Sequence, residues 1–327
     1  MCRQDGVFST MKLSDVALKV LKWFSLSVLM LANGALAQTT PRQVAITIDD
    51  LPYADARPCN EHETVANTKK LLEPIRAAKV PVVGFVIGER CGNLGPEERR
   101  DLLKMWMDGG AELGNHTWSH PDLNRVPLEE YEKEILATDE YLHHTIGPLK
   151  VRYFRPPYLH DGATAETKRL LQSFLTRHGY QEAPVTLDNN DWVFAAAYRR
   201  AIKENDAALA ERIEDAYIPY MESIAAFFER RSVEVLGREC PQVLLIHASR
   251  LNAKMLPTLL QMFRERGYTF VSLEQAMNDK CYRTPDTYVG RKGLSWIHRW
   301  GLARGKPIEP EPEEPVWVDK LSSQPLK

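Results

Sequence analysis

The chain has 327 residues, of which 44% are hydrophobic and 26% are charged, so it holds enough apolar residues to form a sizeable globular core. Its formal net charge of -2 excludes the strongly basic surface that is typical of nucleic-acid-binding proteins. This length suits one large domain or two modest ones.

The N-terminus has the ordered features of a cleavable secretory signal, assigned to residues 1–37. Three lysines precede an apolar run at residues 23–31, and small residues surround Ala37. The apolar run is shorter than the roughly 20 residues that a membrane span needs. We expect cleavage after Ala37 and a periplasmic or secreted protein that has no stable membrane span. An uncleaved anchor is the alternative.

After the signal, short apolar runs alternate with segments in which apolar residues have helical spacing. The predicted strands are residues 44–48, 80–87, 111–114, 151–155, 184–187, 243–247 and 268–273. The predicted helices are residues 64–78, 96–108, 128–144, 164–176 and 254–266, with a long helical region at residues 195–230. This alternation predicts an α/β fold with a mainly parallel sheet and helices outside it. The number of strands favours a barrel over an open sheet.

We expect one catalytic domain at residues 38–280, with a helical insertion at residues 195–232 that lies near the active site. Residues 281–327 form a C-terminal extension. Its acidic, Pro-rich segment KPIEPEPEEP predicts a flexible tail. Trp296 and Trp300 precede that segment, and we expect them to pack on the domain, with contact to a partner as the alternative.

The cleaved chain keeps four cysteines, and an even number in an oxidising compartment suggests disulfides. Four cysteines allow three pairings. We favour Cys59–Cys91 and Cys240–Cys281, because each pair flanks neighbouring elements. Four free thiols are the alternative, and the absence of CxxC spacing argues against metal binding by these residues.

Two groups of candidate metal ligands follow predicted strands. Asp49 and Asp50 end the first strand, and His116 and His120 follow the third. The histidines are four residues apart, which predicts that both imidazoles lie on one side of a helical turn and reach one ion. Two histidines and one carboxylate make a metal site with open positions. Taken alone, the aspartate pair has an alternative interpretation as a solvated turn, and the histidine pair has one as two surface residues.

Three further polar groups follow predicted strands, at the end where α/β barrels carry their active sites. RPPY offers Arg155 as a partner for a carboxylate and the Tyr158 N–H as a donor at a stiff turn. DNNDW offers an Asp that orients a histidine and, in Trp192, an apolar wall. His247 ends an apolar strand. Taken alone, each group has a structural interpretation as the alternative. RPPY would be a structural turn, DNNDW a polar loop and His247 a hydrogen-bonded core histidine.

The ordered set TIDDLP, HTWSH, RPPY, DNNDW and LLIH resembles the five motifs of the polysaccharide deacetylases, also called the NodB-homology or carbohydrate esterase family 4 enzymes. The resemblance spans roughly residues 44–273. It implies a distorted (β/α) barrel and a metal-dependent hydrolase that acts on carbon–nitrogen bonds other than peptide bonds.

The resemblance also implies roles for the motif residues. Asp50, His116 and His120 correspond to the ligands of a divalent metal, most often zinc. The implied catalytic residues are the base Asp49 with its partner Arg155, and the acid His247 with its partner Asp191. The residues that correspond to the substrate-binding set are Tyr158, Pro157, Trp192 and Leu245.

Two features depart from the family pattern. Leu51 stands where the first motif usually has Gly, and the insertion exceeds the compact family core. Both imply altered substrate access. We expect removal of N-acetyl groups from an amino-sugar glycan or a related cell-envelope carbohydrate, with an acetylated carbohydrate as partner and no nucleic acid. The alternatives are a deacylase of a small N- or O-acylated molecule and a catalytically weak carbohydrate-binding protein.

Overall fold

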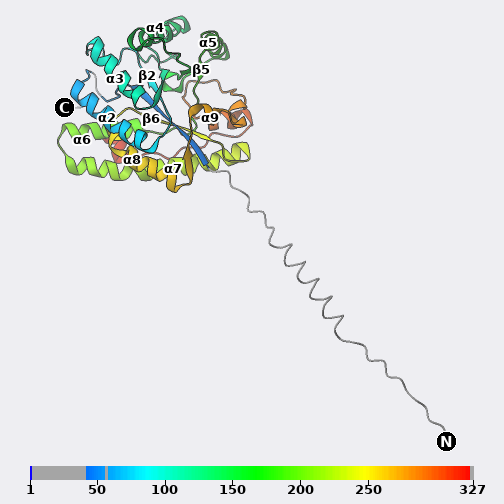
Figure 1. Ribbon diagram of the computed structural model, residues 1–327. Coiled ribbons are helices and arrows are strands. Elements are labelled where there is room, and N and C mark those ends of the chain that lie inside the picture. The colour runs from blue at the N-terminus through cyan, green and yellow to red at the C-terminus, as the bar shows by residue number, and fades with distance from the viewer. Residues whose placement is uncertain (2–41, 56–57, 325–327) are drawn as a thin grey trace. The chain divides into compact units, whose positions relative to one another are not determined.

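In the computed structural model, parallel strands form a curled sheet with helices outside it (Figure 1). The structure describes residue 1 and residues 42–55 and 58–324, so the predicted signal lies almost wholly outside the described residues. Within the described ranges, the seven-stranded sheet has the order β5-β4-β3-β2-β1-β6, and β7 pairs with the start of β1. The strands are β1 (Arg42–Leu51), β2 (Val82–Val86), β3 (Ala111–Asn115), β4 (Tyr153–Phe154), β5 (Gln181–Glu182), β6 (Gln242–His247) and β7 (Tyr268–Phe270).

The sheet closes on itself through the segment that follows β5. The N–H groups of Thr186 and Leu187 each donate to Val243 O at 3.0 Å, and Leu245 N–H donates to Leu187 O at 3.4 Å. These bonds join the β5 side of the sheet to β6, which confirms the predicted α/β distorted barrel. The strand expected at residues 184–187 is reduced to one bridge, because the chain crosses here from β4 to β6 and Pro184 has no N–H to donate.

Helices cover the outside of the barrel (Figure 1). Their bounds are α2 (Glu61–Ala78), α3 (Pro96–Asp108), α4 (Leu128–Ile146), α5 (Ala165–Arg177), α6 (Asp191–Lys203), α7 (Ala207–Leu236), α8 (Arg250–Glu265), α9 (Leu273–Met277), α10 (Trp296–Ala303) and α11 (Val316–Ser323), with short 3-10 helices at Pro157–Leu159 and Lys280–Arg283. Among the described residues, no helix combines the length and the apolar character that a membrane crossing requires.

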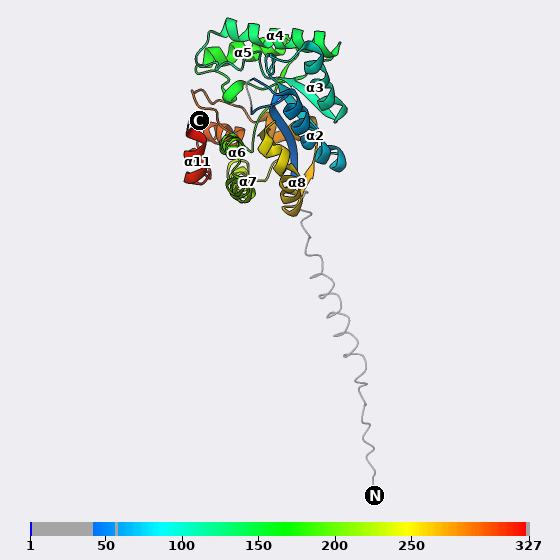
Figure 2. The same ribbon diagram turned by 90° about the vertical axis from the view of Figure 1, so that its left-hand side faces the viewer.

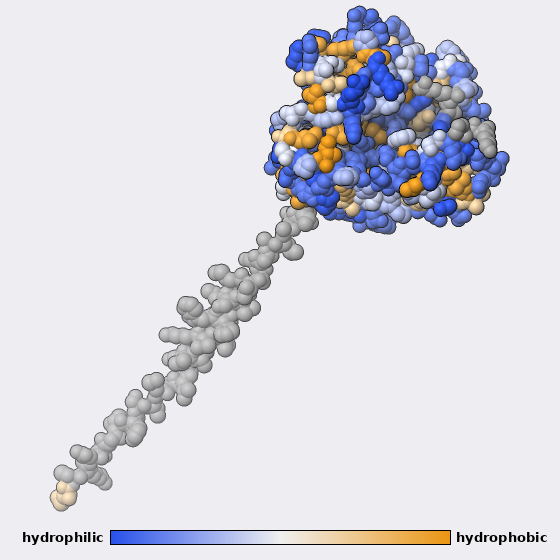
Figure 3. All heavy atoms as spheres, turned by 180° about the vertical axis from the view of Figure 1, so that it is seen from behind, coloured by the Kyte–Doolittle hydropathy of each residue, from blue (hydrophilic) through white to orange (hydrophobic). Residues whose placement is uncertain are grey.

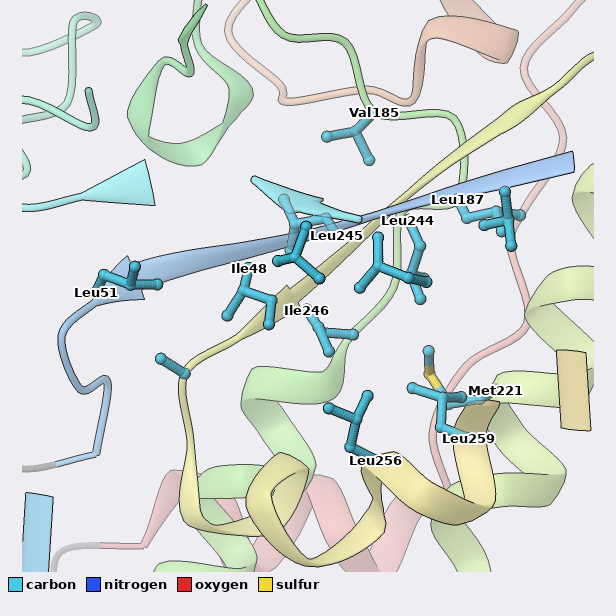
Figure 4. Close-up of a cluster of buried hydrophobic side chains, with 14 of the residues drawn as sticks. Ile48, Leu51, Val185, Leu187, Met221, Leu244, Leu245, Ile246, Leu256 and Leu259 are labelled. Carbon is cyan, nitrogen blue, oxygen red and sulfur yellow. The ribbon is translucent and has the colours of Figure 1, made fainter. Parts of the chain in front are cut away.

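The core lies between β1, β6 and the helices behind them (Figure 4). Ile48, Leu244 and Leu256 are fully buried there. Leu51, which departs from the family motif, is fully buried as well. A Cβ atom placed on Gly84 of β2 would lie only 2.3 Å from Leu51 Cδ2, so the larger side chain is accommodated by a glycine on the neighbouring strand.

The long helical region predicted at residues 195–230 consists of two helices. α6 begins earlier, at Asp191, and ends before Asn205, which has a left-handed backbone with φ 54°. Asp206 then caps α7, because its side chain accepts a hydrogen bond from the Leu209 N–H at 2.9 Å.

The C-terminal extension packs on the domain, so the prediction of a flexible acidic tail was wrong. Glu309 pairs with Arg230 and Arg231 of α7, each at 2.8 Å. α11 lies against α6 (Figure 2). Glu309, one of the acidic residues that suggested a solvated tail, is therefore a partner of basic residues on α7. Trp296 and Trp300 are buried, as expected.

One of the two favoured disulfides is present. Cys59 and Cys91 are bonded, with an S–S distance of 2.00 Å, which confirms the first pairing. Cys240 and Cys281 are free and buried, so the second pairing was wrong. The Cys240 sulfur instead accepts a hydrogen bond from the Ser232 hydroxyl at 3.4 Å.

The surface seen in Figure 3 is mostly hydrophilic, with apolar patches scattered over it. Scattered apolar side chains are normal on a folded domain. Two of the exposed aromatic side chains, Tyr158 and Trp192, belong to the cavity described next.

Candidate active site

A cavity of about 630 Å³ lies at the carboxyl ends of the strands, where active sites of α/β barrels are found. The parallel register places Asp49 at the end of β1 opposite His247 at the end of β6. The lining includes eight of the predicted site residues: Asp49, Asp50, His116, His120, Tyr158, Trp192, Leu245 and His247.

The other three predicted residues lie behind this lining. Arg155 and Asp191 are fully buried and contact lining residues. Pro157 is also buried and does not line the cavity, although its neighbour Pro156 does. The predicted role of Pro157 in substrate binding would therefore be indirect. It starts the short 3-10 helix that carries Tyr158.

Asp50, His116 and His120 form a group that could hold a metal ion. One ligand atom from each residue lies within 4.8 Å of the other two. The Oδ1 atom of Asp50 is 3.8 Å from the Nε2 atoms of both histidines. This oxygen is buried and has no hydrogen-bond partner, although a buried carboxylate oxygen normally has one. A cation between these three atoms would supply the missing partner.

The two imidazoles are suited to metal binding because both are neutral. Burial lowers the pKa of His116 to about 4 and the pKa of His120 to about 3. The Nδ1 atom of His116 lies 2.7 Å from the Arg155 carbonyl oxygen, so it carries the proton and donates there. The Nε2 atom of His116 is thus left as an acceptor that faces Asp50.

HTWSH is a loop rather than the predicted helical turn. Thr117 and His120 have positive φ angles of 68° and 62°, which a helix does not allow. Asn115 fixes the start of the loop, because its side-chain oxygen accepts from the Thr117 N–H at 2.9 Å. Glu134 of α4 fixes the other end by accepting from both the N–H and the hydroxyl of Ser119. The imidazoles converge through these contacts and not through helical spacing.

Asp49 is paired with a buried arginine. Arg155 Nη1 donates to Asp49 Oδ1 at 2.7 Å, and the same nitrogen donates to Thr47 at 2.7 Å. Burial raises the pKa of the Asp49 carboxyl above its usual value, while Arg155 acts in the opposite direction. The carboxyl therefore combines a fixed orientation with a raised proton affinity.

His247 belongs to a chain of hydrogen-bonded side chains, here called the relay, whose other members are Asp191, Asn252 and Tyr217. Asp191 Oδ1 lies 2.7 Å from His247 Nδ1, and Asp191 Oδ2 accepts from the His247 backbone N–H at 2.8 Å. Asn252 donates to Asp191 Oδ2 at 2.6 Å, and the Tyr217 hydroxyl donates to Asn252 at 2.7 Å. Burial disfavours the imidazolium, but the Asp191 carboxylate outweighs burial and raises the pKa of His247 to about 10.

Two half-exposed aromatic side chains stand at the cavity, with Tyr158 55% and Trp192 56% exposed. Tyr158 has a left-handed backbone with φ 60°. The C-terminal extension supports this turn, since Arg299 Nη2 donates to the Leu159 carbonyl at 2.6 Å. A Cβ atom on Gly293 would lie 2.0 Å from the Tyr158 carbonyl oxygen, so only glycine allows this close approach.

Sequence reasoning missed three residues that support the site directly or through a neighbour. Arg90 donates to Asp50 Oδ2, and Asn252 and Tyr217 support Asp191. Arg90 adjoins Cys91, and a charged residue beside a predicted disulfide near a strand end was the available signal. Asn252 and Tyr217 lie in helices without a motif, so no spacing pattern could have linked them to Asp191.

The sequence is similar to known polysaccharide deacetylases over the segment that carries several of these residues. Residues 37–181 match the family model described as polysaccharide deacetylase. The chain is 28% identical over 150 residues to the peptidoglycan-N-acetylglucosamine deacetylase of Bacillus cereus, and the match covers 46% of each chain. It is 26% identical over 220 residues to the peptidoglycan-N-acetylmuramic acid deacetylase PdaA of Bacillus subtilis, covering 67% of this chain and 69% of PdaA.

Among solved structures, the chain is similar to the peptidoglycan deacetylase PdaC of Bacillus subtilis. That match has 23% identity and a TM-score of 0.47, and it covers 75% of this chain and 94% of the other. The matched segment of the family model contains the aspartate pair, HTWSH and RPPY. Over residues 37–181, this chain is therefore similar to the polysaccharide deacetylase family.

Proposed function

We propose that this protein is an exported, metal-dependent hydrolase that removes N-acetyl groups from an amino-sugar glycan of the cell envelope. The observation that carries the proposal is the meeting, in one cavity, of a set of three possible metal ligands, a buried carboxyl and a histidine paired with Asp191. A binding protein on the same fold would have no need for an acid and a base on either side of a metal site.

Asp50, His116 and His120 would hold the metal, for which we propose zinc. Two neutral imidazole nitrogens and one carboxylate oxygen suit zinc and leave open positions. When bound, the ion supplies Lewis acidity that polarises the acyl group and makes a nearby water more acidic. The orphaned Oδ1 atom of Asp50 supports this assignment.

Asp49 would act as the general base. Its Oδ1 atom is held by Arg155, and its Oδ2 atom lies 3.8 Å from His116 Nε2, on the side of the ligand group. Oδ2 is thus the oxygen available to take a proton from the attacking water. The raised pKa of Asp49 increases its affinity for that proton, and the Arg155 charge limits the rise.

His247 would act as the general acid. The raised pKa of about 10 keeps its imidazole protonated at neutral pH. Nδ1 is engaged by Asp191, which leaves Nε2–H to be donated to the departing amine. Asp49 and His247 are Cα partners in the parallel pairing of β1 and β6 and both line the cavity, which supports their proposed roles as base and acid in one site.

The remaining predicted residues would bind the acyl group and the sugar. The Tyr158 N–H would donate to the developing oxyanion, with Pro157 fixing the turn in front of it. Leu245, which is 6% exposed, would contact the acyl methyl group, and Trp192 would offer its exposed ring to a sugar face. The relatives named above act on peptidoglycan sugars, which supports an acetylated amino sugar as substrate.

A direct test is to incubate the purified protein that begins at residue 38 with chitin oligosaccharides and with peptidoglycan fragments and to measure free acetate. We expect release by the zinc-loaded protein, loss of release after removal of the metal with a chelator, and recovery when zinc is restored. Absence of release from every acetylated glycan by protein with one bound zinc would refute the proposed activity.

A further inference from the structure

The loop after β2, residues 87–94, is hydrogen-bonded to both segments that carry the possible metal ligands. Backbone N–H groups at three consecutive positions of this 87–94 loop donate to carbonyl groups beside those ligands. The bonds run from Ile87 to Leu51 at 3.2 Å, from Gly88 to Thr117 at 3.1 Å and from Glu89 to Trp118 at 2.8 Å. The loop is therefore fixed both to the end of β1, next to Asp50, and to the backbone between the two histidines.

The same loop places the positively charged guanidinium of Arg90 against Asp50. Arg90 Nη2 donates to Asp50 Oδ2, and the side chains of the two residues are 8% and 14% exposed. The contact occupies one carboxylate oxygen and leaves the other, Oδ1, facing the Nε2 atoms of His116 and His120. Asp50 also has a positive φ of 65°, so its backbone is in a conformation that other residues rarely adopt.

A disulfide fixes the loop next to this arginine. Cys91 has a left-handed backbone with φ 58° and is bonded to Cys59, which lies between β1 and α2. Asn93 reinforces the link, because it accepts from the Cys59 N–H and donates to the Cys59 carbonyl, both at 2.9 Å. The loop that presents Arg90 is thus cross-linked to the chain that leaves β1.

We propose that Arg90 is a positioning residue of the metal centre, that it holds Asp50 Oδ2 so that Oδ1 alone faces His116 and His120, and that the Cys59–Cys91 disulfide fixes the loop that presents it. The inference rests on the proposed function only in taking these three residues as metal ligands. A carboxylate that binds through one oxygen leaves more positions open for water and substrate.

Two effects of Arg90 on metal affinity oppose each other. Its positive charge repels a divalent cation, whereas its hydrogen bond orients the ligand. The guanidinium charge is already balanced by the carboxylate that it contacts, so we expect orientation to dominate. Loss of such a supporting partner typically weakens metal binding about 10-fold to 100-fold.

The test is to measure zinc affinity of the metal-free protein by calorimetry or by competition with a coloured chelator. We expect Arg90→Gln to raise the Kd for zinc about 10-fold to 100-fold. Arg90→Lys keeps the charge but loses the planar fork, so its Kd should fall between those of the wild type and Arg90→Gln. The double variant Cys59→Ser, Cys91→Ser should raise the Kd in the same direction.

Matched controls separate this effect from a general loss of structure. Arg152→Gln removes an arginine that pairs with Glu112, and Cys240→Ser with Cys281→Ser changes two cysteines that are already free. We expect zinc affinity in both controls to match that of the wild type, because neither change removes a hydrogen bond to Asp50, His116 or His120. Thermal unfolding of the zinc-free proteins identifies any variant that has failed to fold.

An unchanged or lower Kd for folded Arg90→Gln would overturn the proposal, because it would show that repulsion equals or exceeds orientation. This failure is distinguishable from failure of the proposed function. If the wild type binds zinc but releases no acetate, the deacetylase assignment fails while the zinc affinities still decide the role of Arg90.

Discussion

The two sides of the cavity are built in different ways. The side with the proposed metal ligands Asp50, His116 and His120, called the metal side, comes from β1, β2 and β3 and the loops that follow them, and backbone hydrogen bonds and one disulfide hold those loops together. The side with the proposed acid His247, called the acid side, comes from β6, α6, α7 and α8, and a relay of side chains holds it. The metal side is therefore organised by consecutive strands, whereas the acid side depends on side chains from helices that are far apart in the sequence.

This difference predicts separable effects of mutation. Changes in the relay on the acid side should reduce turnover and leave zinc affinity unchanged, because these hydrogen bonds of the relay do not involve the three ligand side chains. Changes in the 87–94 loop should mainly alter zinc affinity. Variants that shift both properties together would break the comparison.

Asp191→Asn should have the larger effect. The substitution removes the carboxylate that opposes burial, so the pKa of His247 should fall from its value of about 10. Because the acid is active only when protonated, kcat/KM of the wild type should fall as pH rises through that pKa. In the variant this alkaline limb should move to lower pH, and kcat at neutral pH should fall about 100-fold or more.

The pH profile distinguishes this role from a structural one. A variant that merely destabilised the fold would lose activity without moving the alkaline limb. Zinc affinity, measured in parallel, should match the wild type. An alkaline limb at the same pH in the wild type and in Asp191→Asn would show that the carboxylate does not control the protonation of His247.

Tyr217→Phe should have the smaller effect. It removes only the hydroxyl that donates to Asn252 at 2.7 Å and leaves the buried Asn252 oxygen without that donor. The free energy of unfolding should fall by about 1–3 kcal/mol, the cost of an unpaired buried polar group. We expect kcat to fall only a few-fold, about 3-fold, since Asp191 keeps its direct contact with His247.

Tyr220→Phe is a suitable comparison for that variant, because Tyr220 also lies on α7 but takes no part in the relay. Its hydroxyl oxygen instead accepts a hydrogen bond from the Asn190 backbone N–H at 2.8 Å. Denaturant unfolding and steady-state kinetics give both quantities. Equal kcat values for Tyr217→Phe and the wild type would limit the relay to Asn252, Asp191 and His247.

The sequence predicted the parallel α/β barrel and the cluster of motif residues because both depend on local patterns. Apolar runs identify strands, and parallel strands bring the residues that follow them to one end of the sheet. The convergence of Asp50, His116 and His120 followed from this placement, even though the predicted helical turn at HTWSH was wrong. The strand ends, rather than the spacing of the histidines, position the site.

The remaining errors concern contacts between distant segments. The sequence around Cys240 does not show that its sulfur accepts a hydrogen bond from the Ser232 hydroxyl. The segment KPIEPEPEEP likewise does not show that Glu309 pairs with Arg231. The supporting residues Asn252 and Tyr217 were missed for the same reason. Such contacts depend on tertiary packing, which composition and periodicity do not encode.

The most direct test of the proposed site is His247→Ala, with bound zinc and acetate release measured on the same sample. The proposed roles predict one zinc per chain, as in the wild type, and acetate release reduced about 100-fold to 10,000-fold, the usual contribution of a general acid. Unchanged acetate release with zinc in place would contradict the assignment of His247 as the acid and with it the proposed division of the cavity.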